Sequence, residues 1–199
     1  MRTVPTHLLY LHGFRSSPKS FKAERLRSWL ATHRPTLHWW CPQLPPSPRE
    51  AMAQVLEGIA DWPRERMAVV GSSLGGFYAS VVAEHTGCAA VVMNPAVDPA
   101  RDLAAHIGEH TAFHDASQRF FFRAEFVSEL AALAPAQFTH PERTLAIIAK
   151  GDELLSWQEM SARYAGATQR LIEGSDHALS DFDQHLPSLL AFLGLAKAA

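Results

Sequence analysis

The sequence has little sulfur, little charge and no long apolar segment. Its two cysteines, Cys41 and Cys88, lie far apart in apolar stretches, which favours reduced, buried thiols over a disulfide framework. Charged residues make up only 19% of the chain and the net charge is -2, so nothing directs the protein to nucleic acid or to an anionic membrane surface. No run of about 18 apolar residues is present, as a membrane-spanning helix would require.

Apolar residues are plentiful enough to fill one sizeable core. They make up 47% of the 199 residues, and this length suits a single domain over residues 1–199. The first residues lead into a short apolar run that does not have the features of a secretory signal, so we expect a cytoplasmic protein. No internal repeat divides the chain.

Apolar runs of strand length alternate with segments of helical periodicity. The expected strands cover residues 7–11, 36–41, 67–70, 89–93, 143–149 and 168–172. This alternation predicts an α/β fold, with a mostly parallel sheet of about six strands and helices on both faces. The pattern stops between residues 100 and 134, where the spacing of apolar residues predicts a short helical, lid-like insertion.

A glycine-flanked serine follows the third expected strand. Gly71, Ser73 and Gly75 form the pattern G-x-S-x-G, which is typical of a sharp strand-to-helix turn that exposes a nucleophilic serine. The glycines allow a strained turn to pass close to other backbone. The alternative is a glycine-rich turn without chemistry. Ser72 does not fit the glycine spacing.

Three other expected strands end in residues that complement a serine nucleophile. His12-Gly13-Phe14 follows the first strand, Asp152 the fifth and His177 the sixth. Parallel strands share their carboxyl edge, and the chain order Ser, Asp, His is that of α/β-hydrolases. We therefore predict Ser73 as nucleophile, His177 as base and Asp152 as the acid that orients it. Asp98, after the fourth strand, is an alternative acid.

The transition state of acyl transfer also needs donors for a negative oxygen. We expect the backbone N–H groups of Phe14 and Leu74 to form this oxyanion hole. His12 is interpreted as a structural residue that shapes the loop, and Asp176 as a loop cap.

The segment before residue 115 is rich in histidine. His106, His110 and His114 lie four residues apart and would share one face of a helix, where they could bind a metal. Gly108 weakens such a helix and the pattern H-E-x-x-H is missing, so a solvated polar face is favoured. We expect no metal and no organic cofactor. Two interpretations of the run Phe120–Phe122 are equally supported: it packs within the lid, or it lines the acyl pocket.

Four motifs resemble those of the YqiA-type small esterases of bacteria. They are Tyr10–Pro18, Gly71–Ala79, Asn94–Val97 and Gly151–Glu153. The resemblance runs from about residue 7 to 193 and implies a minimal α/β-hydrolase that cleaves carboxylic esters with short acyl chains. Carried over by position, it implies Ser73 as nucleophile, Asp152 as acid and His177 as base.

The expected function is therefore a serine esterase that acts on a small-molecule ester through an acyl-enzyme. A thioesterase or acyltransferase would use the same triad, and a non-enzymatic binding module on the same scaffold is a further alternative. A domain of this size has room for only a modest pocket, which favours short acyl chains. The sequence specifies neither the residues of that pocket nor the oligomeric state.

Overall fold

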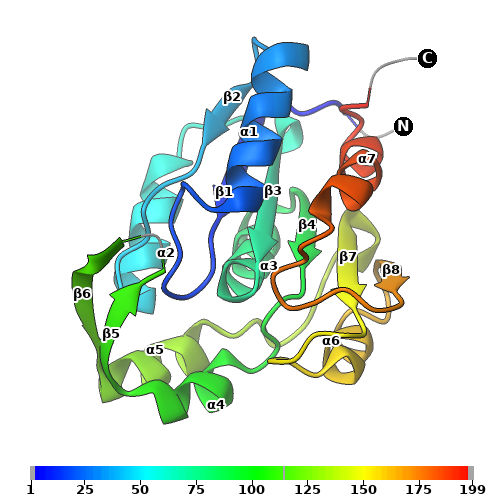
Figure 1. The fold of residues 1–199 in the computed structure, drawn as a ribbon. Helices are drawn as coiled ribbons and strands as arrows, with labels where there is room; N and C mark the ends of the chain where they lie inside the picture. Colours follow the sequence, from blue (N-terminus) through cyan, green and yellow to red (C-terminus); the bar gives the residue numbers. More distant parts are fainter. Residues whose placement is uncertain (1–2, 114, 197–199) are drawn as a thin grey trace.

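A six-stranded parallel sheet forms the centre of the protein (Figure 1). The computed structural model describes residues 3–113 and 115–196. In the sheet the strands follow the order β2-β1-β3-β4-β7-β8, which confirms the expected parallel α/β architecture. Their bounds are β1 His7–Leu11, β2 His38–Trp40, β3 Met67–Ser72, β4 Ala89–Met93, β7 Thr144–Ala149 and β8 Thr168–Ile172.

Helices cover both faces of this sheet. The α-helices are α1 Phe21–His33, α2 Pro48–Gly58, α3 Leu74–Thr86, α4 Pro99–Leu103, α5 Ala124–Leu133, α6 Trp157–Arg163 and α7 Phe182–Phe192. Short 3-10 helices lie at Arg64–Arg66, Ala104–His106 and Pro141–Arg143. Within the described residues, no helix has the length and apolar character needed to cross a membrane.

Alternate side chains of each central strand enter two separate cores. Leu9 and Leu11 of β1 pack on the face covered by α2, α3, α5 and α6, whereas Leu8 and Tyr10 pack beneath α1 and α7. Figure 1 shows α1 and α7 together on one side of the sheet and α3 on the other. Burial on both faces explains why these strands are continuously apolar in the sequence.

The insertion between β4 and α5 is not wholly helical. α4 and a 3-10 helix occupy its beginning, but two antiparallel strands follow, β5 Gly108–Ala112 and β6 Asp115–Phe122. The expectation of helices across residues 100–134 is therefore wrong for this hairpin. The proposed histidine face is also absent, because His106 ends the 3-10 helix and His110 lies in β5. His114 lies outside the described residues.

Two local features account for the hairpin. Gly108 has φ 144°, a backbone angle that ends a helix and that glycine adopts readily. In β6 the aromatic side chains alternate: Phe122 is 1% exposed, whereas Phe121 is 56% exposed. This period of two is that of a strand with one buried face, and the unbroken Phe120–Phe122 run concealed it.

Close backbone contacts fix the turn between β3 and α3. A Cβ atom on Gly71 would lie 2.0 Å from the carbonyl oxygen of Gly75, and one on Gly75 would lie 2.0 Å from that of Leu11. No other residue type fits at either position. Helix α3 therefore begins directly against the end of β1, and the loop that follows β1 lies beside the turn.

Candidate active site

Ser73 occupies the turn between β3 and α3 in a strained conformation. Its φ of 56° and ψ of −124° lie outside the regions that side-chain-bearing residues usually adopt. Backbone hydrogen bonds hold it there, because its N–H donates to the Met93 carbonyl at 3.0 Å and its own carbonyl accepts from Gly76 and Ala96. The sequence-predicted elbow is thus present, with its serine at the carboxyl edge of the sheet.

Ser73, His177 and Asp152 form one hydrogen-bonded chain. Ser73 Oγ lies 2.9 Å from His177 Nε2, and His177 Nδ1 lies 2.8 Å from Asp152 Oδ2. An ionised carboxylate only accepts, so Nδ1 carries the ring proton and Nε2 is left to accept the proton of the serine hydroxyl. These three residues, distant in sequence, therefore have the geometry of a nucleophile, a base and an orienting acid.

The Asp152 carboxylate is buried and fully hydrogen-bonded. Its side chain is 0% exposed, and Oδ1 accepts from the backbone N–H groups of Leu154 and Leu155, each at 2.8 Å. Three donors thus compensate for the loss of water around a charged group. The loop after β7 supplies two of them, so it fixes the carboxylate where it meets the imidazole.

The structure brings Asp152, and not Asp98, to His177. Asp98 is exposed and caps α4, where its Oδ1 accepts from the N–H of Arg101 at 3.1 Å. Asp176 also acts as a cap: its carboxylate accepts from the N–H and hydroxyl of Ser180, and these hydrogen bonds lower its pKa.

The loop after β1 lies against the serine. A Cβ atom on Gly13 would lie 3.2 Å from Ser73 Cβ, so a larger residue there would press on Ser73. Phe14 follows in this loop, and Leu74 is the first residue of α3. Within the described part of the chain, neither of their N–H groups donates to another protein group, which leaves both available to a ligand.

His12 holds this loop in place. Its Nδ1 lies 3.0 Å from the Gly13 carbonyl, and its Nε2 accepts from the N–H of Leu44 at 3.1 Å. One nitrogen must therefore be protonated and the other not, which describes a neutral ring. This matches the structural role expected from the sequence.

Asn94 and Glu153 contact the His177 loop, although no sequence pattern indicated a role for either residue. The Asn94 amide donates to the carbonyls of Asp176 and His177, and Glu153 Oε2 accepts from the N–H of His177 at 2.9 Å. Asn94 is the only asparagine in the sequence and directly follows a buried strand. Its position at the carboxyl edge of the sheet is the feature of the sequence that could have indicated a role in the site.

Lys22 anchors the next residue of this loop. Its ammonium group, on α1, donates to the Ala178 carbonyl. Burial lowers the pKa of Lys22 to about 8, although the nearby charges of Asp176 and Asp152 act to raise it. The loop that carries His177 is therefore held from α1, from the end of β4 and from the loop after β7.

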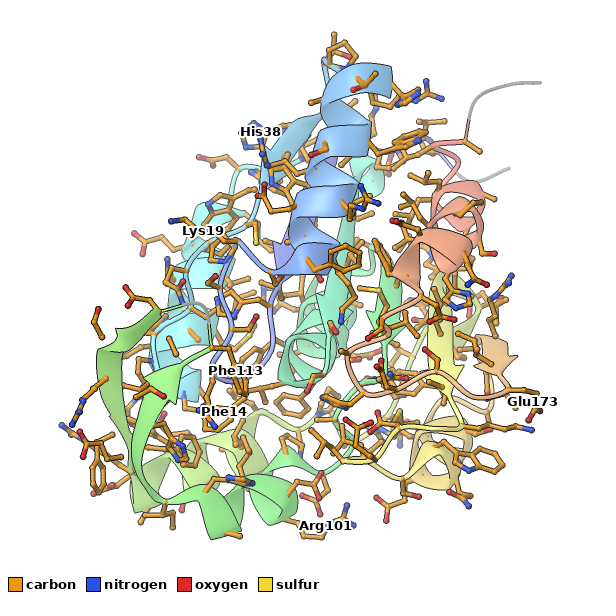
Figure 2. All side chains as sticks on the ribbon, viewed as in Figure 1. Phe14, Lys19, His38, Arg101, Phe113 and Glu173 are labelled. Carbon is orange, nitrogen blue, oxygen red and sulfur yellow. The ribbon has the colours of Figure 1, made fainter. Side chains whose placement is uncertain are left out.

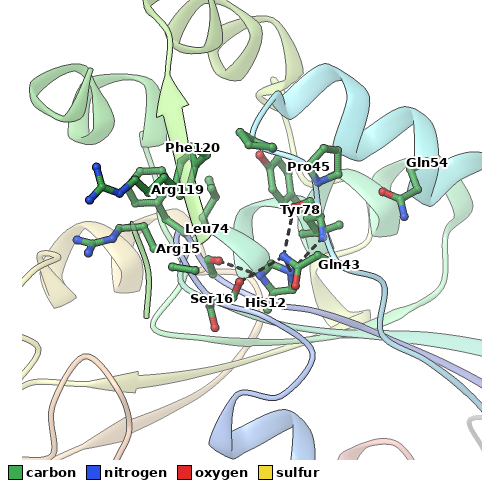
Figure 3. Close-up of a pocket in the computed structure, with 15 residues that line it drawn as sticks. His12, Arg15, Ser16, Gln43, Pro45, Gln54, Leu74, Tyr78, Arg119 and Phe120 are labelled. Carbon is green, nitrogen blue, oxygen red and sulfur yellow. Dashed lines mark hydrogen bonds between the residues drawn. The ribbon is translucent and has the colours of Figure 1, made fainter. Parts of the chain in front are cut away.

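A pocket of about 510 Å³ opens beside the loop after β1 (Figure 3). Its walls come from that loop, from residues 43–46, from Leu74 and Tyr78 of α3, and from the hairpin through Arg119 and Phe120. Phe14 packs edge-on against Phe120 and Phe122, which joins the hairpin to the loop. Phe14 and Phe113 lie at this end of the molecule, away from Glu173 beyond β8 (Figure 2). The described residues contain no group of three side chains suited to a metal ion.

Solved structures with this fold include several hydrolases. Alpha/beta hydrolase domain-containing protein 10 from mouse is 18% identical, with a TM-score of 0.69 over 98% of this chain and 90% of that one. A putative hydrolase from Agrobacterium vitis S4 is 15% identical, with a TM-score of 0.73 over 96% and 91%. The esterase domain of a Rhodothermus marinus protein is 18% identical, with a TM-score of 0.64 over 97% and 86%. The fold is therefore that of the α/β hydrolases.

The sequence itself matches a protein family over nearly its whole length. The model of an uncharacterised protein family, UPF0227, covers residues 7–194. These are nearly the residues over which the motifs resemble the YqiA-type proteins, and the chain therefore belongs to this YqiA-like family, UPF0227.

Proposed function

We propose that the protein is a serine hydrolase that cleaves small carboxylic esters through an acyl-enzyme. The observation that carries this proposal is the hydrogen-bonded chain from Ser73 Oγ through His177 to Asp152, with distances of 2.9 and 2.8 Å. A serine hydroxyl becomes a nucleophile when a base accepts its proton during attack, and imidazole can return that proton to the leaving group.

The proposed reaction has two halves. Ser73 Oγ attacks the ester carbonyl while its proton passes to His177 Nε2; the tetrahedral intermediate collapses and the alcohol leaves with that proton. Water then attacks the acyl-enzyme, gives a proton to His177, and the carboxylic acid leaves as the proton returns to Ser73. Asp152 holds the ring and stabilises the imidazolium in both halves.

The N–H groups of Phe14 and Leu74 would bind the negative oxygen of each tetrahedral intermediate. Both residues line the pocket beside Ser73, and both N–H groups are available to a ligand. One donor of this kind contributes roughly 3 kcal/mol to lowering the barrier. The rigidity of the loop, which His12 holds, means that little reorganisation is needed during reaction.

Two other functions use the same features. A thioesterase or acyltransferase would attack a different acyl donor with the same three residues. A binding module would keep the pocket but would not need a serine held in a strained turn beside a base. The strain at Ser73, with φ 56°, therefore favours catalysis over binding alone.

The first prediction concerns the hydrogen-bonded chain. We expect Ser73→Ala and Asp152→Asn each to lower kcat/KM for 4-nitrophenyl butyrate by about 10⁴-fold. The first removes the nucleophile and the second leaves the imidazole in the wrong tautomer. Ser72→Ala and Asp98→Asn are the matched controls, and circular dichroism checks that all four variants fold. If Asp98→Asn were inactive and Asp152→Asn active, Asp98 would be the acid.

The second prediction concerns acyl length and acyl donor. The pocket volume of about 510 Å³ is modest for a ligand site, where roughly 300–1,000 Å³ is usual. We therefore expect 4-nitrophenyl butyrate to have a higher kcat/KM than the palmitate. The proposed esterase activity further predicts that oxygen esters are hydrolysed faster than acyl-CoA thioesters of equal length. Faster turnover of the long chain would contradict the pocket argument, and faster turnover of thioesters would favour a thioesterase.

A further inference from the structure

The pocket beside Ser73 carries positive charge on one side. Arg15 and Arg119 both line it, and among its described lining residues there is no aspartate or glutamate. Figure 3 shows both arginine side chains on one side of the pocket, with Gln43 and Gln54 on the other. A wall of this kind is unusual for a site that holds only an alkyl chain, since such sites are mostly apolar.

Both arginines are positioned through the hairpin. Arg15 Nε donates to the Thr111 carbonyl at 2.9 Å, and the Arg15 guanidinium stacks over the Phe113 ring. Thr111 is paired with Arg119 in the antiparallel ladder, so the side chains of these two residues point to the same face. Arg15 Nη2 also lies 3.5 Å from the Thr111 hydroxyl, so Arg15 and Arg119 both lie on the face of the hairpin that carries the Thr111 side chain.

Each guanidinium retains unused donors, since the contacts of Arg15 to the carbonyl and hydroxyl of Thr111 use two of its five N–H groups. Arg119 Nη1 donates to Glu109 Oε1 at 3.1 Å, but the two side chains are 68% and 60% exposed, so this ion pair is weak. A guanidinium has five N–H donors, and this contact occupies one. A ligand carboxylate or phosphate could therefore bind Arg119 alongside Glu109 or in its place.

We propose that the substrate carries a negative charge, placed on the acyl or alcohol side so that Arg15 and Arg119 bind it. The proposal rests on the proposed function and specifies its substrate class as an anionic ester. The exposed ion pair with Glu109 only partly neutralises this wall, and hydrogen bonds from guanidinium groups to an anion are stronger than hydrogen bonds between neutral groups.

The test compares matched charged and neutral esters. One pair is the mono-4-nitrophenyl ester of adipate and its methyl ester, which places the charge on the acyl side. The other is 4-acetoxybenzoate and its methyl ester, which places it on the alcohol side. In at least one pair we expect a roughly tenfold higher kcat/KM for the anion. Arg119→Gln and 0.5 M NaCl should bring that ratio towards one, whereas Arg170→Gln, on β8, should keep it.

The outcomes separate this inference from the proposed function. Equal or faster turnover of both neutral esters overturns the anionic substrate and leaves the hydrolase intact. An anion preference that Arg119→Gln does not reduce overturns the role of the arginines. Hydrolysis of none of the four esters contradicts the proposed function itself.

A second inference concerns Asn94. This side chain is 0% exposed and sits at the end of β4, in a left-handed conformation with φ 40°. Its amide nitrogen donates to the carbonyls of Asp176 and His177 at 2.9 and 3.2 Å, and its oxygen accepts from the N–H of Ala149 at 2.8 Å. The amide thus joins the His177 loop to the end of β7, from which the chain continues to Asp152.

We infer that Asn94 is a positioning residue that keeps His177 within reach of both Ser73 and Asp152. Like the first, this inference rests on the proposed function. An amide is suited to the task because it donates on one side and accepts on the other. In Asn94→Asp the side chain keeps its shape and its bond to Ala149 but loses both donors, so the two loop carbonyls face a carboxylate.

Gln169 provides a matched control. Its amide nitrogen also donates to two backbone carbonyls, those of Ser161 and Tyr164, but these lie in α6 and just after it. We expect Asn94→Asp to lower kcat for 4-nitrophenyl butyrate at least tenfold with little change in KM, whereas Gln169→Glu keeps kcat. Urea unfolding of both variants measures how much each substitution lowers the free energy of unfolding.

A proton NMR spectrum gives a readout that does not depend on turnover. The proton between His177 Nδ1 and Asp152 should give a far-downfield signal in the wild type and in Gln169→Glu, and a shifted or missing one in Asn94→Asp. If Asn94→Asp keeps both its kcat and this signal, or if both variants lose kcat alike, the positioning role is wrong. If no ester is hydrolysed while the signal still depends on Asn94, the proposed function fails and the positioning survives.

Discussion

The approach of α3 to the end of β1 is the contact on which the rest of the site depends. Gly75 lies so close to the Leu11 carbonyl that a Cβ atom would come within 2.0 Å of it. This brings the start of the helix and the loop after β1 together around Ser73. Ser73 and the two available N–H groups, whose residues line the pocket, are therefore neighbours because of backbone packing, and a larger residue at position 75 would separate them.

A buried negative charge is the second constraint. The Asp152 carboxylate is removed from water. The free-energy cost of burying it is offset by hydrogen bonds from the N–H groups of Leu154 and Leu155 and from His177. The imidazole in turn depends on its loop, which Asn94, Glu153 and Lys22 hold from three different elements.

The sequence predicted the sheet and the meeting of the three candidate residues at its edge, because both depend on local patterns. The strands are continuously apolar runs, and parallel strands share a carboxyl edge. The sequence alone therefore predicts that Ser73, Asp152 and His177 lie close together. The hairpin could not be predicted in the same way. Its period of two was hidden by Phe121, an exposed aromatic residue between two that face inward, and by histidines at helical spacing. Asn94 was missed because its three partners lie on segments distant in sequence.

The arginine side of the pocket depends on that same hairpin, so it could only be found in the structure. Arg15 lies in the loop after β1 and Arg119 in β6, about a hundred residues later. Each contacts the hairpin strand β5, one through the Thr111 carbonyl and the other through Glu109. The insertion therefore supplies positive charge to the pocket and contacts the loop after β1 through Arg15 and Phe14.

Covalent labelling with a fluorophosphonate tests the central claim most directly. In this reaction the serine oxygen attacks phosphorus and fluoride leaves, so only an activated nucleophile reacts. Mass spectrometry of the intact protein should show one added phosphonate group, mapped to the peptide that contains Ser73, and Ser73→Ala should remain unlabelled. Wild-type protein that is folded and stays unmodified, or a Ser73→Ala variant that still reacts, would contradict the account.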